Sequence, residues 1–282
     1  MPTSATARDT APAFDRRGVP AAGPPVIIDA VSKVYSNGTK ALDHVAFTVA
    51  DREFVTLVGP SGCGKSTLLR MVAGLGSPTS GEITVFALPP AEARKQQGGA
   101  TFVFQDPTLM PWRSVLANVT LPLELRGVDP AVRAQEGMLA LELVGLAGSA
   151  RAYPRQLSGG MKMRVSIARA MAVHPQLLLM DEPFGALDEI TRQRLDRELQ
   201  SLWARSRLTV LFVTHNVFEA VFMSTRIVVM SPQPGRVAGV VAVGVPFPRE
   251  DAFRSSPEFG RLVQRVTELL AGAGVDGLAG DA

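Results

Sequence analysis

The chain has 282 residues, of which 46 % are hydrophobic and 20 % are charged, as expected for a folded protein with one large domain or two smaller ones. The net charge is only +3 and no run of basic residues is present, so we do not expect nucleic acid as a partner. The single cysteine, Cys63, excludes an intrachain disulfide and is typical of a reducing compartment.

The two ends of the chain differ in composition from its middle. Residues 1–25 are rich in alanine, proline and threonine and lack the apolar core of a signal peptide, so we expect a disordered tail there. Residues 246–282 are expected to form a C-terminal helix, near 257–270, and a flexible end. No apolar stretch approaches the roughly 18 residues of a membrane-spanning helix, so any link to a membrane is expected to come through a partner.

The middle of the chain alternates between strand and helix patterns. Apolar or alternating runs predict strands at residues 26–28, 31–35, 42–49, 54–58, 81–85, 101–104, 177–180, 209–213 and 227–230. Helices are predicted at residues 68–73, 161–174, 189–205 and 216–223, and leucines recur at helical spacing between 114 and 148. Strands that alternate with helices predict an α/β fold with a mainly parallel sheet.

The most specific motif lies between a predicted strand and a predicted helix. It fits the pattern of a phosphate-binding loop and consists of Gly59, Pro60, Ser61, Gly62, Cys63, Gly64, Lys65, Ser66 and Thr67. Backbone N–H groups of such a loop, together with the helix N-terminus, bind phosphate oxygens. Lys65 is expected to reach the β- and γ-phosphates, and Ser66 to offer its hydroxyl to Mg²⁺. The flanking strand and helix argue against an ordinary glycine-rich turn.

Cys63 lies inside this loop and close to the predicted helix N-terminus. A helix N-terminus favours the thiolate form of cysteine, so we expect alkylation of Cys63 to block nucleotide binding. The alternative is that Cys63 is only a small packing residue.

Asp181 and Glu182 follow the apolar run 177–180, which is typical of a strand buried on both faces of a parallel sheet. Ligands bind at the carboxyl ends of such strands, so the two carboxylates can meet the phosphate loop although 116 positions (181 − 65) separate Lys65 from Asp181. We expect Asp181 to hold Mg²⁺ and Glu182 to orient and deprotonate the attacking water. The alternative for Asp181 is the cap of a following helix.

The three histidines have different settings. His215 follows the predicted strand 209–213, where its imidazole is expected to donate to a γ-phosphate. A capping or surface histidine is the alternative. His44 and His174 are expected to be structural.

The order of motifs along the chain resembles that of ATP-binding-cassette (ABC) ATPases, and the similarity covers about residues 26–245. The matching features are Tyr35, the loop 59–67, Gln105, the segment 157–161, Asp181 with Glu182, the segment 186–188, and His215. The segment 157–161 discriminates best, because other phosphate-loop proteins lack it. The resemblance implies a P-loop NTPase fold with a mainly parallel sheet, an antiparallel β subdomain and an inserted helical subdomain at about 106–172.

The resemblance also implies roles for individual residues. Tyr35 would stack on the adenine of ATP, Gln105 would sense Mg²⁺ and the attacking water, and Asp188 would link two ATP sites. The family forms head-to-tail dimers, so a homodimer is expected. In it the signature residues of one copy would close the ATP site of the other; they are Ser158, Gly159 and Gly160. A serine and two glycines before a helix suit a γ-phosphate.

Residues 104–115 are similar to the corresponding segment of nitrate, sulfonate and taurine importer ATPases. This similarity implies that the chain energises uptake of a small anion or organosulfur compound from the cytoplasmic face of the cell membrane, as a peripheral protein. Integral-membrane permease subunits would be its direct partners, and an extracytoplasmic solute-binding protein an indirect one. Met110 and Trp112 are expected to anchor the permease interface, with a buried core aromatic as the alternative for Trp112.

Two positions depart from the family pattern. Met161 stands where many relatives carry glutamine, and we expect activity to survive this change. Asn216 stands where aspartate is common, which removes a charge beside His215 and leaves the local hydrogen bonding open.

Other classes explain less of the chain. A soluble, non-transport ABC ATPase of translation or DNA repair shares the ATP chemistry, but such proteins usually carry two cassettes or a long coiled coil, and this chain has neither. A nucleotide kinase or GTPase would not explain the segment 157–161.

Overall fold

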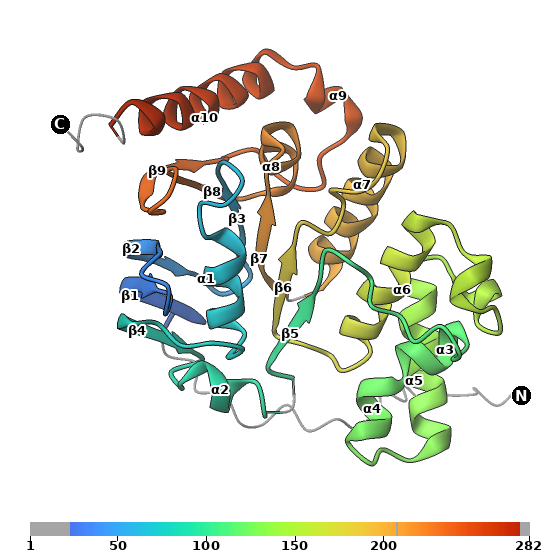
Figure 1. Ribbon diagram of the computed structural model, residues 1–282. Coiled ribbons are helices and arrows are strands. Elements are labelled where there is room, and N and C mark those ends of the chain that lie inside the picture. Colours follow the sequence, from blue (N-terminus) through green and yellow to red (C-terminus); the bar gives the residue numbers. More distant parts are fainter. Residues whose placement is uncertain (1–22, 97, 207, 277–282) are drawn as a thin grey trace, which may run out of the picture.

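A six-stranded sheet, a small antiparallel sheet and a group of helices beside them make up the computed structural model (Figure 1). The structure describes residues 23–276 apart from residues 97 and 207. Most of the expected N-terminal tail and the last residues of the expected flexible end therefore lie outside the described residues.

The six-stranded sheet has the order β5-β6-β7-β3-β8-β9. Its strands are β3 (Phe54–Val58), β5 (Ala100–Val103), β6 (Leu177–Asp181), β7 (Thr209–Thr214), β8 (Arg226–Met230) and β9 (Val237–Ala242). All neighbours pair in parallel except β8 and β9, which are antiparallel. The mainly parallel sheet is as predicted. The sequence pattern does not predict β9, because its pairing with β8 is a tertiary contact.

Both faces of this sheet are covered. On β3, Phe54 and Val58 pack into the cluster with the helices α6 (Gly159–Met171), α7 (Glu189–Arg205) and α8 (Val217–Met223). Val55 and Leu57 point to the other face, where α1 (Lys65–Val72) and the small sheet lie. Burial on two faces explains why these strands are continuously apolar rather than alternating.

The small sheet is antiparallel and has the order β2-β1-β4, with strands β1 (Val26–Val34), β2 (Lys40–Val49) and β4 (Ser80–Val85). It confirms the predicted antiparallel subdomain. One strand, β1, replaces the two predicted at its position, because the pairing register shifts between Ile28 and Val31 and Ala30 has a φ of 47°.

The remaining helices form two groups. The short α2 (Pro90–Ala93) precedes β5, whereas α3 (Val115–Val119), α4 (Leu121–Leu125) and α5 (Pro130–Leu143) pack with α6 beside the β5 edge, as the leucine spacing predicts (Figure 1). Two 3-10 turns, η1 (Ala147–Ser149) and η2 (Pro154–Gln156), join this group to α6. Helix α6 ends at Met171, before the predicted limit, and His174 has a left-handed φ of 49°.

The C-terminal segment crosses back over α7 and α8. It contains α9 (Asp251–Arg254) and α10 (Pro257–Asp276), and α10 packs on α8, β8 and β9 (Figure 1). Helix α10 is longer than the prediction for it. Among the described residues, none of the helices combines the length and the apolar character that crossing a bilayer requires.

Candidate functional site

The phosphate loop joins the end of β3 to the start of α1. Helix α1 has no side-chain cap and no acidic residue in its first turn, so its first N–H groups are available to an anion. Gly64 precedes the helix with a φ of 93°, and a Cβ there would lie 2.6 Å from Cδ2 of Leu42 and 2.8 Å from the carbonyl oxygen of Ala41. Only glycine therefore fits at this turn.

Lys65 lies within the loop. Its Nζ donates hydrogen bonds to the carbonyl oxygens of Gly59 and Pro60, both at 2.8 Å, and the residue is buried. Both acceptors are neutral, so they do not cancel the ammonium charge. The loop consequently favours an anionic ligand.

Ser66 and Asp181 meet across the loop, as the sequence argument expects. The Ser66 hydroxyl donates to Oδ1 of Asp181 at 2.6 Å. Burial raises the pKa of Asp181, while the Ser66 hydrogen bond and the charge of Arg70 oppose the rise. Hydroxyl and carboxylate oxygens are ligands that Mg²⁺ prefers, so this pair suits a magnesium ion.

The helix-cap alternative for Asp181 is wrong. Asp181 is the last residue of β6, and the next helix, α7, begins only at Glu189. The residue that caps α7 is Asp188, whose carboxylate accepts a hydrogen bond from the Thr191 N–H at 3.0 Å. This hydrogen bond lowers the pKa of Asp188, which is exposed.

Glu182 and His215 lie at the ends of neighbouring strands and contact each other. The distance between Oε2 of Glu182 and Nδ1 of His215 is 3.0 Å. Gln105 belongs to the same group, because a Cβ on Gly185 would lie 3.6 Å from Oε2 of Glu182 and 3.8 Å from Nε2 of Gln105. The structure thus brings together three residues that the sequence places 110 positions apart (215 − 105).

The backbone of Glu182 is strained. Its φ is 44°, a left-handed value that costs a non-glycine residue about 1–3 kcal/mol. Two hydrogen bonds hold the turn: the Glu182 N–H donates to the carbonyl of Val213 at 3.0 Å, and the Gly185 N–H donates to the carbonyl of Glu182 at 3.1 Å. Such strain concentrates at functional sites.

Tyr35 lies beside Thr67, the last residue of the loop. Its hydroxyl is 2.9 Å from Oγ1 of Thr67, and its side chain is half-exposed. Its ring is therefore next to the phosphate loop and accessible to a ligand.

The signature residues lie elsewhere in the chain. Ser158 is the exposed N-cap of α6, and its Oγ accepts a hydrogen bond from the Met161 N–H at 3.3 Å. Helices α6 and α1 pack on opposite faces of the sheet, with β6 between them in Figure 1. The N-terminus of α6 therefore does not belong to the group of residues around the phosphate loop of its own chain.

Sequence reasoning missed two residues that hold the segment after Gln105. The guanidinium of Arg169 donates to the carbonyls of Pro107 at 2.8 Å and Thr108 at 3.0 Å, and burial lowers the pKa of Arg169. Asn118 is fully buried in α3 and accepts a hydrogen bond from the Met110 N–H at 2.7 Å. Its amide also donates to three carbonyls of this segment, those of Met110, Arg113 and Ser114. A lone asparagine among the apolar residues of a short helix is the signal that could have revealed it.

The structure also corrects the alternative offered for Trp112. Its side chain is 74 % exposed, so it is not a core aromatic of the helical subdomain. Met110 is half-buried.

For Cys63 the structure favours the alternative of a small packing residue. The side chain is buried and packs with the core cluster around β3 and α1. Burial raises the pKa of the Cys63 thiol, and the charge of nearby Lys65 only partly opposes this.

We therefore expect Cys63 to resist thiol reagents in the folded protein. Labelling with a chromogenic disulfide reagent should be at least ~10-fold slower in the native chain than in the denatured chain, because a protonated, buried thiol is a poor nucleophile. Equal rates in the two states would show that the thiol is accessible.

We expect Asn118→Ala to lower the free energy of unfolding by about 2–4 kcal/mol, because it removes a fully buried side chain and takes away the partner of the Met110 N–H and of the Arg113 carbonyl. Denaturant titration followed by circular dichroism measures the change. Gln264→Ala on the exposed face of α10 is the matched control, with an expected change within about 0.5 kcal/mol. A similar small change for Asn118→Ala would contradict the anchoring role.

Comparisons with known proteins agree with this geometry. Residues 42–185 match the ABC transporter family. An uncharacterized ABC transporter ATP-binding protein of Methanocaldococcus jannaschii is 44 % identical over 86 % of this chain and 90 % of its own length. A taurine import ATP-binding protein of Rhizobium johnstonii is 42 % identical over 84 % and 91 %, and an aliphatic sulfonates import ATP-binding protein of Bacillus cereus is 41 % identical over 84 % and 94 %.

Solved structures show the same fold. A dimeric post-hydrolysis state of an ATP-binding cassette with bound ADP and Pi superimposes with a TM-score of 0.69 and 32 % identity, covering 78 % of this chain and all of the cassette. The dimeric structure of a bacterial ABC transporter cassette gives the same values. The chain therefore belongs to the ABC transporter family and is one of its ATP-binding, ATP-hydrolysing proteins.

Proposed function

We propose that the chain is the ATPase subunit of an importer for a small anion or organosulfur compound, of the nitrate, sulfonate and taurine type. The observation that carries the ATPase part is that the pairs Ser66–Asp181 and Glu182–His215 meet at the phosphate loop. The names of the taurine and aliphatic sulfonate import relatives support the substrate class.

ATP would bind with its phosphates in the loop 59–67 and its adenine against Tyr35. Ser66 and Asp181 would hold Mg²⁺, with Gln105 beside it, and the ion would neutralise charge on the β- and γ-phosphates. Lys65 would move its ammonium group from the loop carbonyls to the phosphates, where it stabilises the charge of the transition state.

Glu182 and His215 would carry the hydrolytic step. The carboxylate of Glu182 would accept a proton from the attacking water, and Gln105 would help to orient that water. The contact of Nδ1 of His215 with Glu182 leaves Nε2 to donate to the γ-phosphate. Positioning and electrostatics supply most of the catalysis in phosphoryl transfer, and the strained turn at Glu182 would place the base.

A second copy of the chain would complete each site. Ser158, the N-cap of α6, and Gly159, its first residue, are exposed, whereas Gly160 is buried; all three lie apart from the phosphate loop of their own chain. In a head-to-tail homodimer they would close on the γ-phosphate held by the partner, and Asp188 would lie between the two sites. The dimeric cassettes with the same fold support this arrangement.

A groove at the β5 edge suits a membrane subunit. It encloses about 260 Å³ and is lined mainly by apolar residues of β5, α4 and the end of α1, among them Leu75, Phe102, Phe104 and Pro122. Leu125 on α4 is 80 % exposed, and Trp112 is also exposed. Since β5 carries Gln105 just beyond its end, a helix of a permease seated there would sense the ATP site. The chain would then lie at the cytoplasmic face of the membrane as a peripheral protein.

Glu182→Gln tests the assignment of the catalytic base. The variant should bind ATP but lower kcat by at least ~100-fold, because the amide cannot accept the proton of the attacking water. Size-exclusion chromatography with ATP should show an accumulated dimer, while the exposed Glu82→Gln control should turn over normally. Normal turnover of Glu182→Gln would reject the assignment.

Reconstitution tests the transport function. The chain is assembled in vesicles with its permease and a solute-binding protein. This complex should hydrolyse ATP at least several-fold faster when taurine, an alkanesulfonate or nitrate is added than when none of them is present. Phosphate release measures the effect. If the chain instead copurifies with ribosomes or DNA and shows no stimulation, the soluble alternative is correct.

A further inference from the structure

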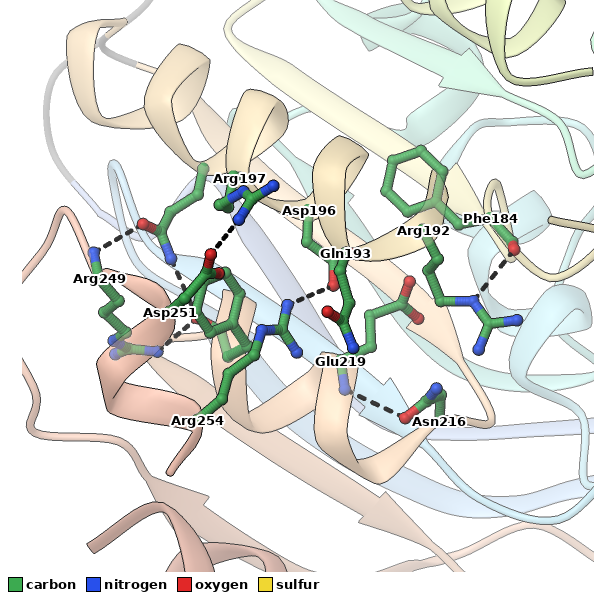
Figure 2. A network of polar contacts seen from close by, with 12 residues as sticks. Phe184, Arg192, Gln193, Asp196, Arg197, Asn216, Glu219, Arg249, Asp251 and Arg254 are labelled. Carbon is green, nitrogen blue, oxygen red and sulfur yellow. Dashed lines mark hydrogen bonds and ion pairs between the residues drawn. The ribbon is translucent and has the colours of Figure 1, made fainter. Parts of the chain in front are cut away.

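Two carboxyl groups lie buried together behind the ATP site. Asp196 on α7 is 1 % exposed and Glu219 on α8 is 4 % exposed (Figure 2). Neither belongs to the motifs that the sequence singles out, and neither contacts the phosphate loop. Burial of two acids side by side is costly unless a counter-charge or a proton compensates them.

Their oxygens are only partly satisfied by other side chains. Oδ2 of Asp196 accepts a hydrogen bond from Nη2 of Arg254 at 2.7 Å. Oδ1 of Asp196 and Oε1 of Glu219 are buried and have no donor among the described residues. The two side chains are within hydrogen-bonding reach of each other, so one proton between them would satisfy both oxygens.

The surroundings place this proton on Glu219. Burial first, and the charge of Asp196 second, raise the pKa of Glu219 to about 8. Burial also raises the pKa of Asp196, but the cation of Arg254 on α9 and the more distant Arg192 on α7 oppose that rise. From β7, the hydroxyl of Thr214 lowers the pKa of Glu219 without reversing the shift.

The pair is connected to His215 through α8. The Glu219 N–H donates to Oδ1 of Asn216 at 3.1 Å, so Asn216 caps the helix that carries Glu219 (Figure 2). This cap settles the hydrogen bonding that the sequence left open at Asn216. His215 precedes the cap and contacts Glu182. A shift of α8 would therefore move the imidazole relative to the catalytic carboxylate.

The pair is also connected to the turn that follows Glu182. Arg192 lies one turn before Asp196 on α7, and its guanidinium donates to the carbonyls of Leu187 at 2.9 Å and Phe184 at 3.4 Å. A movement of α7 would therefore displace this turn through the two hydrogen bonds that Arg192 makes to its carbonyls.

The C-terminal segment fixes both helices from behind. The guanidinium of Arg249 donates to the carbonyls of Val221 and Phe222, both at 2.9 Å. The backbone N–H of Arg249 donates to Oε1 of Gln200 on α7 at 2.7 Å. Arg254 stacks on the ring of Phe222 with 3.6 Å between its Cζ and the ring centroid. Asp251 pairs with Arg197 on the outer side (Figure 2).

We propose that Asp196 and Glu219, joined by one shared proton and clamped by Arg254, are positioning residues that hold α8 and thereby His215 for ATP hydrolysis. With the proton in place, α7 and α8 pack closely. Loss of the proton puts two negative charges in contact, and α8 moves away from α7. Hydrolysis then slows, whereas ATP binding by the phosphate loop, which leads into α1 on the other face of the sheet, does not change.

The first test compares pH profiles of kcat in the full-length protein. Glu219→Gln gives Asp196 a permanent donor of the same shape. Between about pH 7 and about pH 9, kcat of the wild type should fall ~10-fold more than kcat of Glu219→Gln, while KM for ATP stays equal. Glu268→Gln, on the exposed face of α10, should follow the wild type. Parallel profiles of the wild type and Glu219→Gln, or a difference confined to KM, would overturn the proposal.

A second variant should move the fall in kcat to higher pH. Arg254→Gln removes the cation that favours ionised Asp196, so the pair should keep its proton to higher pH and the fall in kcat should move up by about one pH unit. A shift in the other direction would contradict the shared proton.

Spectroscopy and unfolding test the proton without catalysis. Infrared difference spectra should show a protonated carboxyl band that disappears as pH rises through about 8, and Glu219→Gln should lack it. The raised pKa in the folded state means that the stabilisation is complete below the unfolded pKa and is lost as pH rises. The free energy of unfolding of the wild type should therefore fall relative to that of Glu219→Gln between about pH 5 and about pH 9. A band that persists in Glu219→Gln would assign the proton elsewhere.

Discussion

Parallel pairing of β3, β6 and β7 is the constraint on which the rest of the structure depends. Because parallel strands end at the same edge, the residues that follow them come together from distant parts of the chain. Ser66 reaches Asp181 with a hydrogen bond of 2.6 Å, and Glu182 reaches His215 at 3.0 Å. A shift of one residue in the register would turn these side chains to the opposite face and dissolve both pairs.

Core composition makes that register secure. Every strand of the group presents alternate apolar residues to two separate clusters, one against α6, α7 and α8 and the other against α1 and the small sheet. If one strand shifted by one residue, its side chains that now pack in one cluster would have to pack in the other. The polar site is therefore held by apolar packing below it, and the strain of Glu182 is supported by the same packing.

The sequence predicted the fold class and the candidate site residues, because both depend on local patterns. The phosphate loop, the apolar runs of the buried strands and the leucine spacing of the helical group are readable residue by residue. What it could not provide are properties that arise between segments. Cys63 has the letters of a reactive thiol, yet core packing buries it. The sequence left Trp112 open between an interface anchor and a core aromatic, and only the packing shows that it is exposed.

The same limit applies to the buried acids. Asp196 and Glu219 read as ordinary polar residues of amphipathic helices, and only the return of the C-terminal segment covers them. Likewise, the role of Arg169 and Asn118 depends on hydrogen bonds to the segment after Gln105, which packs against both of them. The environments of these residues depend on contacts between segments that are distant in the sequence, and local periodicity does not predict such contacts.

The contact between α6 and α7 has a consequence for communication in the dimer. A Cβ on Gly160 would lie only 2.9 Å from Cγ2 of Thr191. Because glycine has no Cβ, the Thr191 side chain on α7 can pack directly against the backbone of α6. The helix behind Ser158, which would face the partner's nucleotide, thus bears directly on the helix whose start carries Asp188. In each protomer, α6 and α7 would therefore couple the nucleotide bound by the partner to the protomer's own nucleotide. This coupling depends on the close contact that Gly160 allows between the two helices.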